Sequence, residues 1–193
     1  MLKTESYTEQ LSMVRPTLDD LHWIPRLPDE WNLQKAGQGH RKGIADLLAA
    51  VFSGLTWTQE EVDAKLLKAP DVPETVVVTA TDGSVAATAS LQVNAVHPGM
   101  AVLHWVASHP NHRGKQLGSI VTLAVLYAGR NRGMKGSFLL TDDFRLPAIR
   151  TYLKLGYLPV TRSDPALETR WDQVYASLGL IRKQVPAPHL INP

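Results

Sequence analysis

Apolar residues in the first half of the chain follow the spacing of a strand and then that of a helix. Residues 31–36 have the composition of a short strand. After two glycines, the apolar positions Ile44, Leu47 and Leu48 recur three and four residues apart within residues 41–53. This is the period of an amphipathic helix, so the pattern predicts a strand followed by a helix.

A second helix and a hairpin follow. Thr58 stands three positions before Glu61, the spacing of a capping box, and this predicts a helix that runs to about residue 67. Two β-rich runs within residues 74–94 flank the dipeptide Asp-Gly at 82–83. Asp-Gly supplies the positive φ that a tight hairpin turn needs, so these runs are predicted to form an antiparallel hairpin.

The second half alternates strands and helices. The segment 117–131 is apolar on nearly all sides, which indicates a buried helix, and it lies between two strand-like runs. The predicted elements are a strand at 101–108, a helix at 117–131, a strand at 136–143, a helix at 147–156, a strand at 157–162 and a helix at 167–180. We therefore expect a mixed α/β (α+β) fold: a mostly antiparallel sheet flanked by helices, with one parallel strand–helix–strand crossover late in the chain.

Residues 1–30 form an N-terminal extension that contains prolines. Pro16, Pro25 and Pro28 prevent a long helix there. Its apolar residues are expected to pack on the domain or on a second subunit of a homodimer: Leu21, Trp23, Ile24 and Leu27. We place the main domain at 31–162, and expect residues 163–193 to add a C-terminal helix and tail to it.

Composition narrows the class of protein. The 193 residues suffice for one domain with a core, and the formal net charge of +2 favours neither a nucleic-acid partner nor a membrane partner. Because the chain has no cysteine, it has no disulfide, no thiolate metal site and no cysteine nucleophile. Its His, Asp and Glu residues show no metal-ligand spacing, and its N-terminus shows no signal pattern. We expect a soluble, cytoplasmic protein without a metal.

The loop at 109–119 carries the first functional signal. Arg113, Gly114, Lys115 and Gly118 precede the buried helix directly. A helix N-terminus has unpaired N–H groups and partial positive charge, and glycines let a ligand approach the backbone, so a pyrophosphate would fit here. An ordinary basic strand–helix turn is the alternative.

Two patterns together resemble the GNAT superfamily of N-acetyltransferases. The motif Q/R-x-x-G-x-G/A of that family falls on residues 113–118, and its second block falls on residues 145–157. The second block is matched by Ala148, Tyr152, Gly156 and Tyr157. The resemblance covers residues 31–162, and it departs from the pattern at Gln116, where the family has glycine, and at Arg145, where the family has asparagine.

The resemblance implies acetyl-CoA as the cosubstrate and a small-molecule or peptide amine as the acceptor. The backbone of the strand end at 106–108 would hold the pantetheine arm and help polarise the thioester carbonyl. Gln116 can still offer its backbone N–H, and Arg145 would pair with a cofactor phosphate or lie in solvent. The implied cofactor-binding residues are Val106, Ala107, Ser108, Arg113, Gly114, Lys115, Gln116, Leu117, Gly118, Ser119 and Arg145.

Two residues are candidates for proton transfer. In the resembling family, the tyrosine at the position of Tyr152 is the acid for the departing thiolate; a core residue is the alternative role. His104 precedes the pantetheine strand end and titrates near neutral pH, so it is the candidate base, with a purely structural histidine as the alternative. Asp142 and Asp143 are expected to form a turn or cap a helix.

Three functions follow from these patterns. The first is direct transfer of an acetyl group from acetyl-CoA to an amine, with no covalent enzyme intermediate. The second is a non-catalytic module of the same fold that senses acyl-CoA, which the substitutions Gln116 and Arg145 favour. The third, a basic nucleic-acid-binding domain, is disfavoured by the small net charge.

Overall fold

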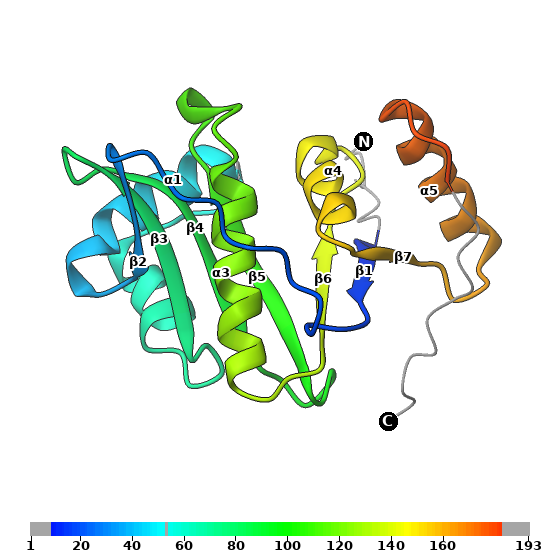
Figure 1. The fold of residues 1–193 in the computed structure, drawn as a ribbon, viewed down its shortest axis with the longest axis horizontal. Coiled ribbons are helices and arrows are strands. Elements are labelled where there is room, and N and C mark those ends of the chain that lie inside the picture. Colours follow the sequence, from blue (N-terminus) through cyan, green and yellow to red (C-terminus); the bar gives the residue numbers. More distant parts are fainter. Residues whose placement is uncertain (1–8, 53, 183–193) are drawn as a thin grey trace, which may run out of the picture.

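A seven-stranded mixed sheet forms the centre of the computed structural model, which describes residues 9–52 and 54–182 (Figure 1). The strand order is β2-β3-β4-β5-β6-β1-β7, and all neighbouring strands are antiparallel except the parallel pair β5 and β6. The strands are β1 Leu11–Arg15, β2 Trp31–Lys35, β3 Glu74–Ala80, β4 Val85–Gln92, β5 Met100–Ser108, β6 Gly136–Thr141 and β7 Leu158–Val160. The fold class predicted from the sequence is confirmed.

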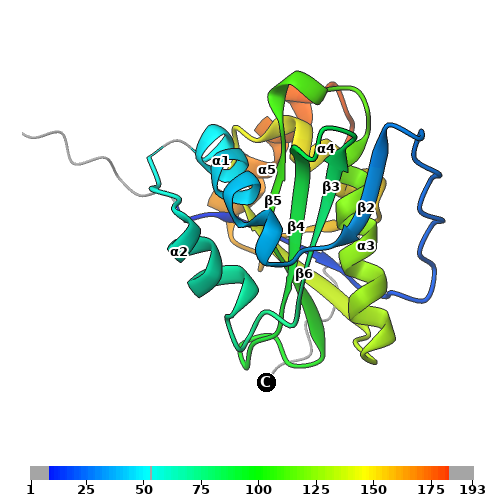
Figure 2. The same cartoon turned by 90° about the vertical axis from the view of Figure 1, so that its left-hand side faces the viewer.

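Helices cover both faces of the sheet (Figure 2). The helices are α1 Arg41–Val51, α2 Gln59–Val62, α3 Leu117–Asn131, α4 Leu146–Lys154 and α5 Pro165–Ser177. Val76 and Val78 of β3 face the core under α3, whereas Val77 between them faces the core under α1 and α2. Since successive side chains of a strand point to opposite faces, the valine run at 76–78 is buried on both sides.

The hairpin and the capped helix form as the local signals predict. Gly83 has φ +83° in the turn between β3 and β4. Thr58 Oγ1 accepts a hydrogen bond from the Glu61 N–H at 3.3 Å at the start of α2. The predicted single helix to residue 67 is nevertheless two pieces, because the chain passes from α2 into a π-helical turn at Asp63–Leu67.

The N-terminal extension contributes a strand that the sequence analysis missed. Strand β1 lies between β6 and β7 and pairs with both in antiparallel register, so part of residues 1–30 belongs to the sheet of the domain. Leu11, Met13 and Val14 on this strand are buried. A five-residue strand buried on both faces shows no alternation, which is why its pattern was not recognised.

Most of the predicted apolar residues of the extension pack on the domain. Leu18 is fully buried, and Leu21, Ile24 and Leu27 pack against the same core. The side chain of Trp23 is 90% exposed, so it does not pack on its own domain, and packing on a second subunit stays a prediction. The described part of the extension therefore covers the surface of the domain itself.

The sheet opens where β5 and β6 separate. The two strands pair only between Met100–Val102 and residues 136–138, although β5 continues to Ser108 and β6 to Thr141 (Figure 1). A bulge in β5 accompanies the separation: its register against β4 shifts near Ala89, and Trp105 has φ +47°. A bulge bends a strand and increases its twist, so β5 turns away from β6 and leaves a gap in the sheet.

No helix within the described ranges is long and apolar enough to cross a membrane.

Candidate functional site

Two adjoining cavities lie at the opening between β5 and β6. The loop-side cavity, of about 610 Å³, lies between the start of α3 and helix α4. The strand-side cavity, of about 370 Å³, lies between β5, β6 and the residues that follow α1. The residues that line both cavities are Val106, Arg145, Ala148 and Tyr152.

The start of α3 presents backbone donors to the loop-side cavity. Leu117, Gly118 and Ser119 line the cavity and form the first turn of the helix, whose N–H groups have no acceptor within the helix. No side chain caps this helix. The N-terminus of α3 is therefore open to an anion, as the sequence predicts.

Gln116, which stands at a glycine position of the family motif, has a left-handed backbone conformation. Its φ of 58° and ψ of 15° are left-handed, and it holds the N-cap position of α3. Gly114 two residues earlier has φ +81°. Glycine adopts such a conformation without strain, whereas glutamine adopts it at a backbone cost of about 1–2 kcal/mol.

Gly118 brings the start of α3 close to the end of β5. A Cβ atom at this position would lie 3.1 Å from the Ser108 Oγ. Val106, Ala107 and Ser108, the strand end that the family resemblance assigns to a pantetheine arm, line the same cavity. Gly118 has no positive φ, so what its missing side chain provides is close approach to Ser108.

The two cations of the loop lie in different places. Arg113 lines the loop-side cavity. Lys115 instead directs its Nζ to Glu30, at 3.3 Å from Oε1, and lies 5.1 Å from the centroid of the Trp31 ring. The contacts of Lys115 therefore do not favour its predicted role at a phosphate.

Thr122 is a residue of this cavity that the sequence analysis missed. It lies one helical turn after Gly118 in the wall of the loop-side cavity, and its buried Oγ1 has no hydrogen-bond partner among the residues that the structure describes. A buried hydroxyl without a partner is costly, so a ligand in the cavity would gain a hydrogen bond there. A polar residue within an apolar helix was the only signal for it.

Arg145 connects the two cavities. Its Nε donates to Asp142 Oδ2 at 2.8 Å, and its guanidinium lies 4.4 Å from the ring centroid of Phe52 and 5.3 Å from that of Phe144. The sequence suggested a phosphate or solvent as its partner. The structure shows a carboxylate and two aromatic rings.

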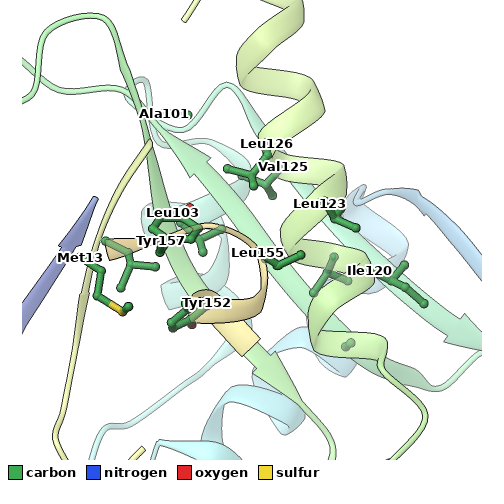
Figure 3. Close-up of a cluster of buried hydrophobic side chains, with 14 of the residues drawn as sticks. Met13, Ala101, Leu103, Ile120, Leu123, Val125, Leu126, Tyr152, Leu155 and Tyr157 are labelled. Atoms are coloured by element: carbon green, nitrogen blue, oxygen red, sulfur yellow. The ribbon is translucent and has the colours of Figure 1, made fainter. Parts of the chain in front are cut away.

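Tyr152 lies on α4 in the wall common to both cavities. Burial raises the pKa of its hydroxyl above the ordinary value of 10, so the group stays protonated and can act as a donor. The ring of Tyr157 lies 5.7 Å away, within the same buried cluster (Figure 3). Tyr157 has a different environment, because its hydroxyl bonds to the buried Ser137 Oγ at 2.6 Å.

His104 lines the strand-side cavity. Burial lowers the pKa of its imidazole to about 4, because the charged form loses hydration. The side chain is therefore neutral at pH 7 and can accept a proton, although it is a weaker base than an exposed histidine. Its ring meets that of Trp105 edge to face at 5.2 Å between centroids.

The two aspartates at the end of β6 differ from each other. Asp142 lines the strand-side cavity and accepts from Gln10 Nε2 at 3.1 Å as well as from Arg145. Asp143 accepts two bonds from Arg170, at 2.6 and 3.0 Å, and these bonds lower the pKa of its carboxyl. Neither side chain caps α4, whose N-cap position is Arg145, but the two residues lie in a turn that the Arg145 N–H closes on the Asp142 carbonyl at 3.0 Å. Of the two alternatives that the sequence offered, the turn is confirmed and the cap is wrong.

Most of the strand-side cavity could not be found from local sequence patterns. Its lining comes from segments that are distant in the sequence, and includes Gln10, Phe52, Leu55, Asn94, Trp105, Leu140 and Thr141. None of these residues belongs to a motif, and only the fold brings them together.

The sequence matches the model of a known protein family. The model of the Acetyltransferase (GNAT) family matches residues 41–157. A mycothiol acetyltransferase from Nocardia farcinica is 37% identical over 62 residues, which are 32% of this chain and 20% of that protein.

Solved structures share the fold. A GCN5-related N-acetyltransferase from Sphaerobacter thermophilus has a TM-score of 0.61 and 19% identity, over 79% of this chain and 49% of that one. A protein described as a transcriptional regulator from Bacillus halodurans has a TM-score of 0.56 and 19% identity, over 65% of this chain and 91% of that one. The chain thus spans a fifth of the Nocardia protein and about half of the Sphaerobacter protein. The family match covers more than half of this chain, and it includes the α3 loop and Tyr152; the chain belongs to the GNAT acetyltransferase family.

Proposed function

We propose that this protein transfers an acetyl group from acetyl-CoA directly to an amine, with no covalent enzyme intermediate. The observation that carries the proposal is the junction of the two cavities. Tyr152 lies in a wall that both cavities share, so groups bound on the two sides would meet beside its hydroxyl. The family match supports acetyl-CoA as the cosubstrate.

The loop-side cavity has groups suited to CoA. The uncapped first turn of α3 would receive the pyrophosphate, and the Arg113 guanidinium would add a full positive charge. The end of β5 offers backbone groups at 106–108 to the pantetheine arm. The unpaired Thr122 Oγ1 would bond to a polar atom of the same arm.

The chain supplies proton transfer on both sides of the junction. Acetyl-CoA brings a thioester, whose C–S bond breaks as the new C–N bond forms. The amine must lose a proton to react, and the neutral His104 imidazole in the strand-side cavity would accept it, directly or through water. The Tyr152 hydroxyl would give its proton to the departing sulfur. The chain has no cysteine that could form an acetyl-enzyme thioester, which supports direct transfer.

A second candidate is a module of the same fold that binds acyl-CoA without catalysis. Two observations favour it: Gln116 replaces a motif glycine, and the charge of Asp142 in the strand-side cavity is compensated by Arg145. The fold alone does not decide between the two, because it is shared with a solved protein described as a transcriptional regulator.

Two measurements test the proposal in sequence. Calorimetric titration with CoA should show binding, and Arg113→Ala should weaken that binding more than Lys115→Ala does. Release of free thiol from acetyl-CoA should then depend on an added amine, across a panel of small amines and peptides. Tight CoA binding without amine-dependent thiol release would support the sensor, whereas absence of CoA binding would overturn both candidates.

A further inference from the structure

We propose that the strand-side cavity takes a small primary amine that carries an aromatic or aliphatic group and no carboxylate, with Asp142 as the residue that binds its ammonium. The inference names the acceptor class for the proposed acetyl transfer and rests on that function for its biological meaning. Its physical content is binding, which can be measured without any transfer.

The charges in the cavity favour a cation at Asp142. Its charged lining residues are Asp142 and Arg145, and the lowered pKa leaves His104 neutral at pH 7. The guanidinium of Arg145 already bonds to Asp142 and lies against the rings of Phe52 and Phe144. Arg145 therefore compensates part of the charge of Asp142 and is held against the two rings, so Asp142 is the group of this pair that can bind a cationic ligand.

Asp142 retains room for another donor. Gln10 Nε2 bonds to its Oδ1 and Arg145 Nε bonds to its Oδ2, so each carboxylate oxygen has one partner. A carboxylate can accept about four hydrogen bonds, which leaves two sites for an ammonium. The side chain is 29% exposed and lines the cavity, and its two partners fix its orientation.

Gln10 gives this site a contribution from the N-terminal extension. It precedes β1, which lies beside β6 in the sheet, and this placement brings its amide to the carboxylate at the end of β6. Asp143, the next residue, lines neither described cavity and is held by Arg170. The two neighbouring carboxylates thus form a natural pair of test and control.

The remaining walls suit an apolar group. Phe52 and Trp105 meet edge to face with centroids 5.1 Å apart, and both line the cavity. Leu55 and Leu140 line it as well, and each is about half exposed. Burying apolar surface against these side chains stabilises a ligand with a hydrocarbon or aromatic portion, and the rings also favour a nearby cation.

An acceptor with a carboxylate beside its amine fits poorly. It would bring a second negative charge next to Asp142. The cation on which its carboxylate would depend is Arg145, and the bond from Nε to Asp142 and the contacts with two aromatic rings restrict how that guanidinium can turn toward it. A free amino acid should therefore bind more weakly than the amine that lacks its carboxylate.

Two probes that share a phenyl ring and a primary amine, and differ only by a carboxylate, test this inference. Calorimetric titration of the full chain at pH 7 with saturating CoA would compare 2-phenylethylamine with phenylalanine. We expect 2-phenylethylamine to bind at least about 10-fold more tightly. The carboxylate of phenylalanine is repelled by Asp142, and this repulsion offsets the attraction between Asp142 and the ammonium group. Equal or tighter binding of phenylalanine would overturn the inference.

Variants locate the contact. Asp142→Asn should weaken 2-phenylethylamine binding by about 10-fold or more and leave CoA affinity unchanged, whereas Asp143→Asn should leave both affinities unchanged. Unchanged amine affinity in Asp142→Asn would overturn the role of Asp142. If this variant does not fold, the comparison of the two probes on the unmodified protein still decides the ligand class.

The outcome is separable from the fate of the proposed function. Binding of 2-phenylethylamine without thiol release from acetyl-CoA would retain the ligand class and reject acetyl transfer to this amine. Thiol release that is faster with phenylalanine than with 2-phenylethylamine would retain acetyl transfer and reject the ligand class.

Discussion

The two cavities on either side of Tyr152 are built in different ways. The loop-side cavity is formed by the end of β5, by the loop and first turn of α3 within 112–119, and by residues 144–152, and the uncapped first turn of α3 gives it a set of backbone N–H groups. The strand-side cavity is formed by side chains from the N-terminal segment, the end of α1, β4, β5, β6 and α4. A site made of backbone keeps its function when side chains change, whereas a site made of side chains changes with each of them.

The substitution at Gln116 illustrates the first kind of site. Glutamine stands at the position of a motif glycine in a left-handed conformation, and the residues that follow it still form the uncapped start of α3 in the wall of the loop-side cavity. The strand-side cavity has no comparable constraint, and its acceptor specificity can be altered one residue at a time. This is the physical reason why a family can share a cosubstrate and differ in acceptor.

The largest effect is expected at the junction of the two cavities. Tyr152→Phe keeps the ring and removes the proton donor, so kcat should fall by about 10²–10⁴-fold with little change in CoA affinity or in Tm. Steady-state kinetics and a single-turnover measurement, which isolates the chemical step, would check this. A kcat within a few-fold of the unmodified protein, with chemistry limiting turnover, would reject the role.

Tyr157→Phe is the matched control for this variant. Tyr157 lies beside Tyr152 but bonds to Ser137 in the core, so its loss should cost about 1–3 kcal/mol of stability and leave kcat unchanged. If instead Tyr152→Phe lowers Tm and Tyr157→Phe lowers kcat, the two tyrosines have the opposite roles.

The backbone-built cavity can be broken by one side chain. In Gly118→Asp the new Cβ would lie 3.1 Å from Ser108 Oγ, and the carboxylate would enter the path expected for the phosphates. Like-charge repulsion and lost N–H contacts should weaken CoA binding by at least about 100-fold in calorimetric titration. Gly37→Asp is the control, because a Cβ there meets nothing within 4 Å; CoA affinity equal in both variants would mean that the α3 loop is only structural.

The same contrast determines how much of the molecule could be predicted from sequence. Local patterns were sufficient for α3 and for the turn at Gly83, since an apolar helix and an Asp-Gly turn depend on adjacent residues. They were insufficient for β1, because a short buried strand lacks alternation and its position between β6 and β7 depends on pairing with distant segments. The π-helical turn after Val62 had no recognised signal either.

The candidate site divides along the same line. The α3 loop was located because its motif is contiguous, and Tyr152 because it lies at a fixed distance along one helix. The direction of Lys115 depends on Glu30 and Trp31, far away in the sequence, and could not be predicted. The contact between Gln10 and Asp142 spans 132 positions and is visible only in the folded chain.

A smaller effect, on stability, is expected from the buried His104 in the strand-side cavity. The pKa of His104 is about 4 in the folded protein and 6.5 without burial, so between these pH values the unfolded chain binds more protons than the folded one. The free energy of unfolding should therefore fall as pH decreases from 6.5 to 4, by at most about 1.4 kcal/mol per pH unit from this residue. Denaturant titrations of the unmodified protein and His104→Gln would isolate this contribution. Parallel pH profiles in the two proteins would show that His104 is not buried as described.

The smallest effect is expected at Gln116, in the turn before α3. Gln116→Gly should relieve a left-handed backbone cost of about 1–2 kcal/mol. Glycine loses about 0.5–1 kcal/mol more entropy on folding, so the net gain should be about 0–1.5 kcal/mol, a rise in Tm of at most about 6 °C. Gln116→Ala keeps the conformational cost and should show no rise in Tm. If the loop-side cavity is a backbone site, CoA affinity stays the same in both variants. A loss of affinity in both would instead assign the Gln116 side-chain amide to the ligand, and would make this turn depend on its side chain as the strand-side cavity does.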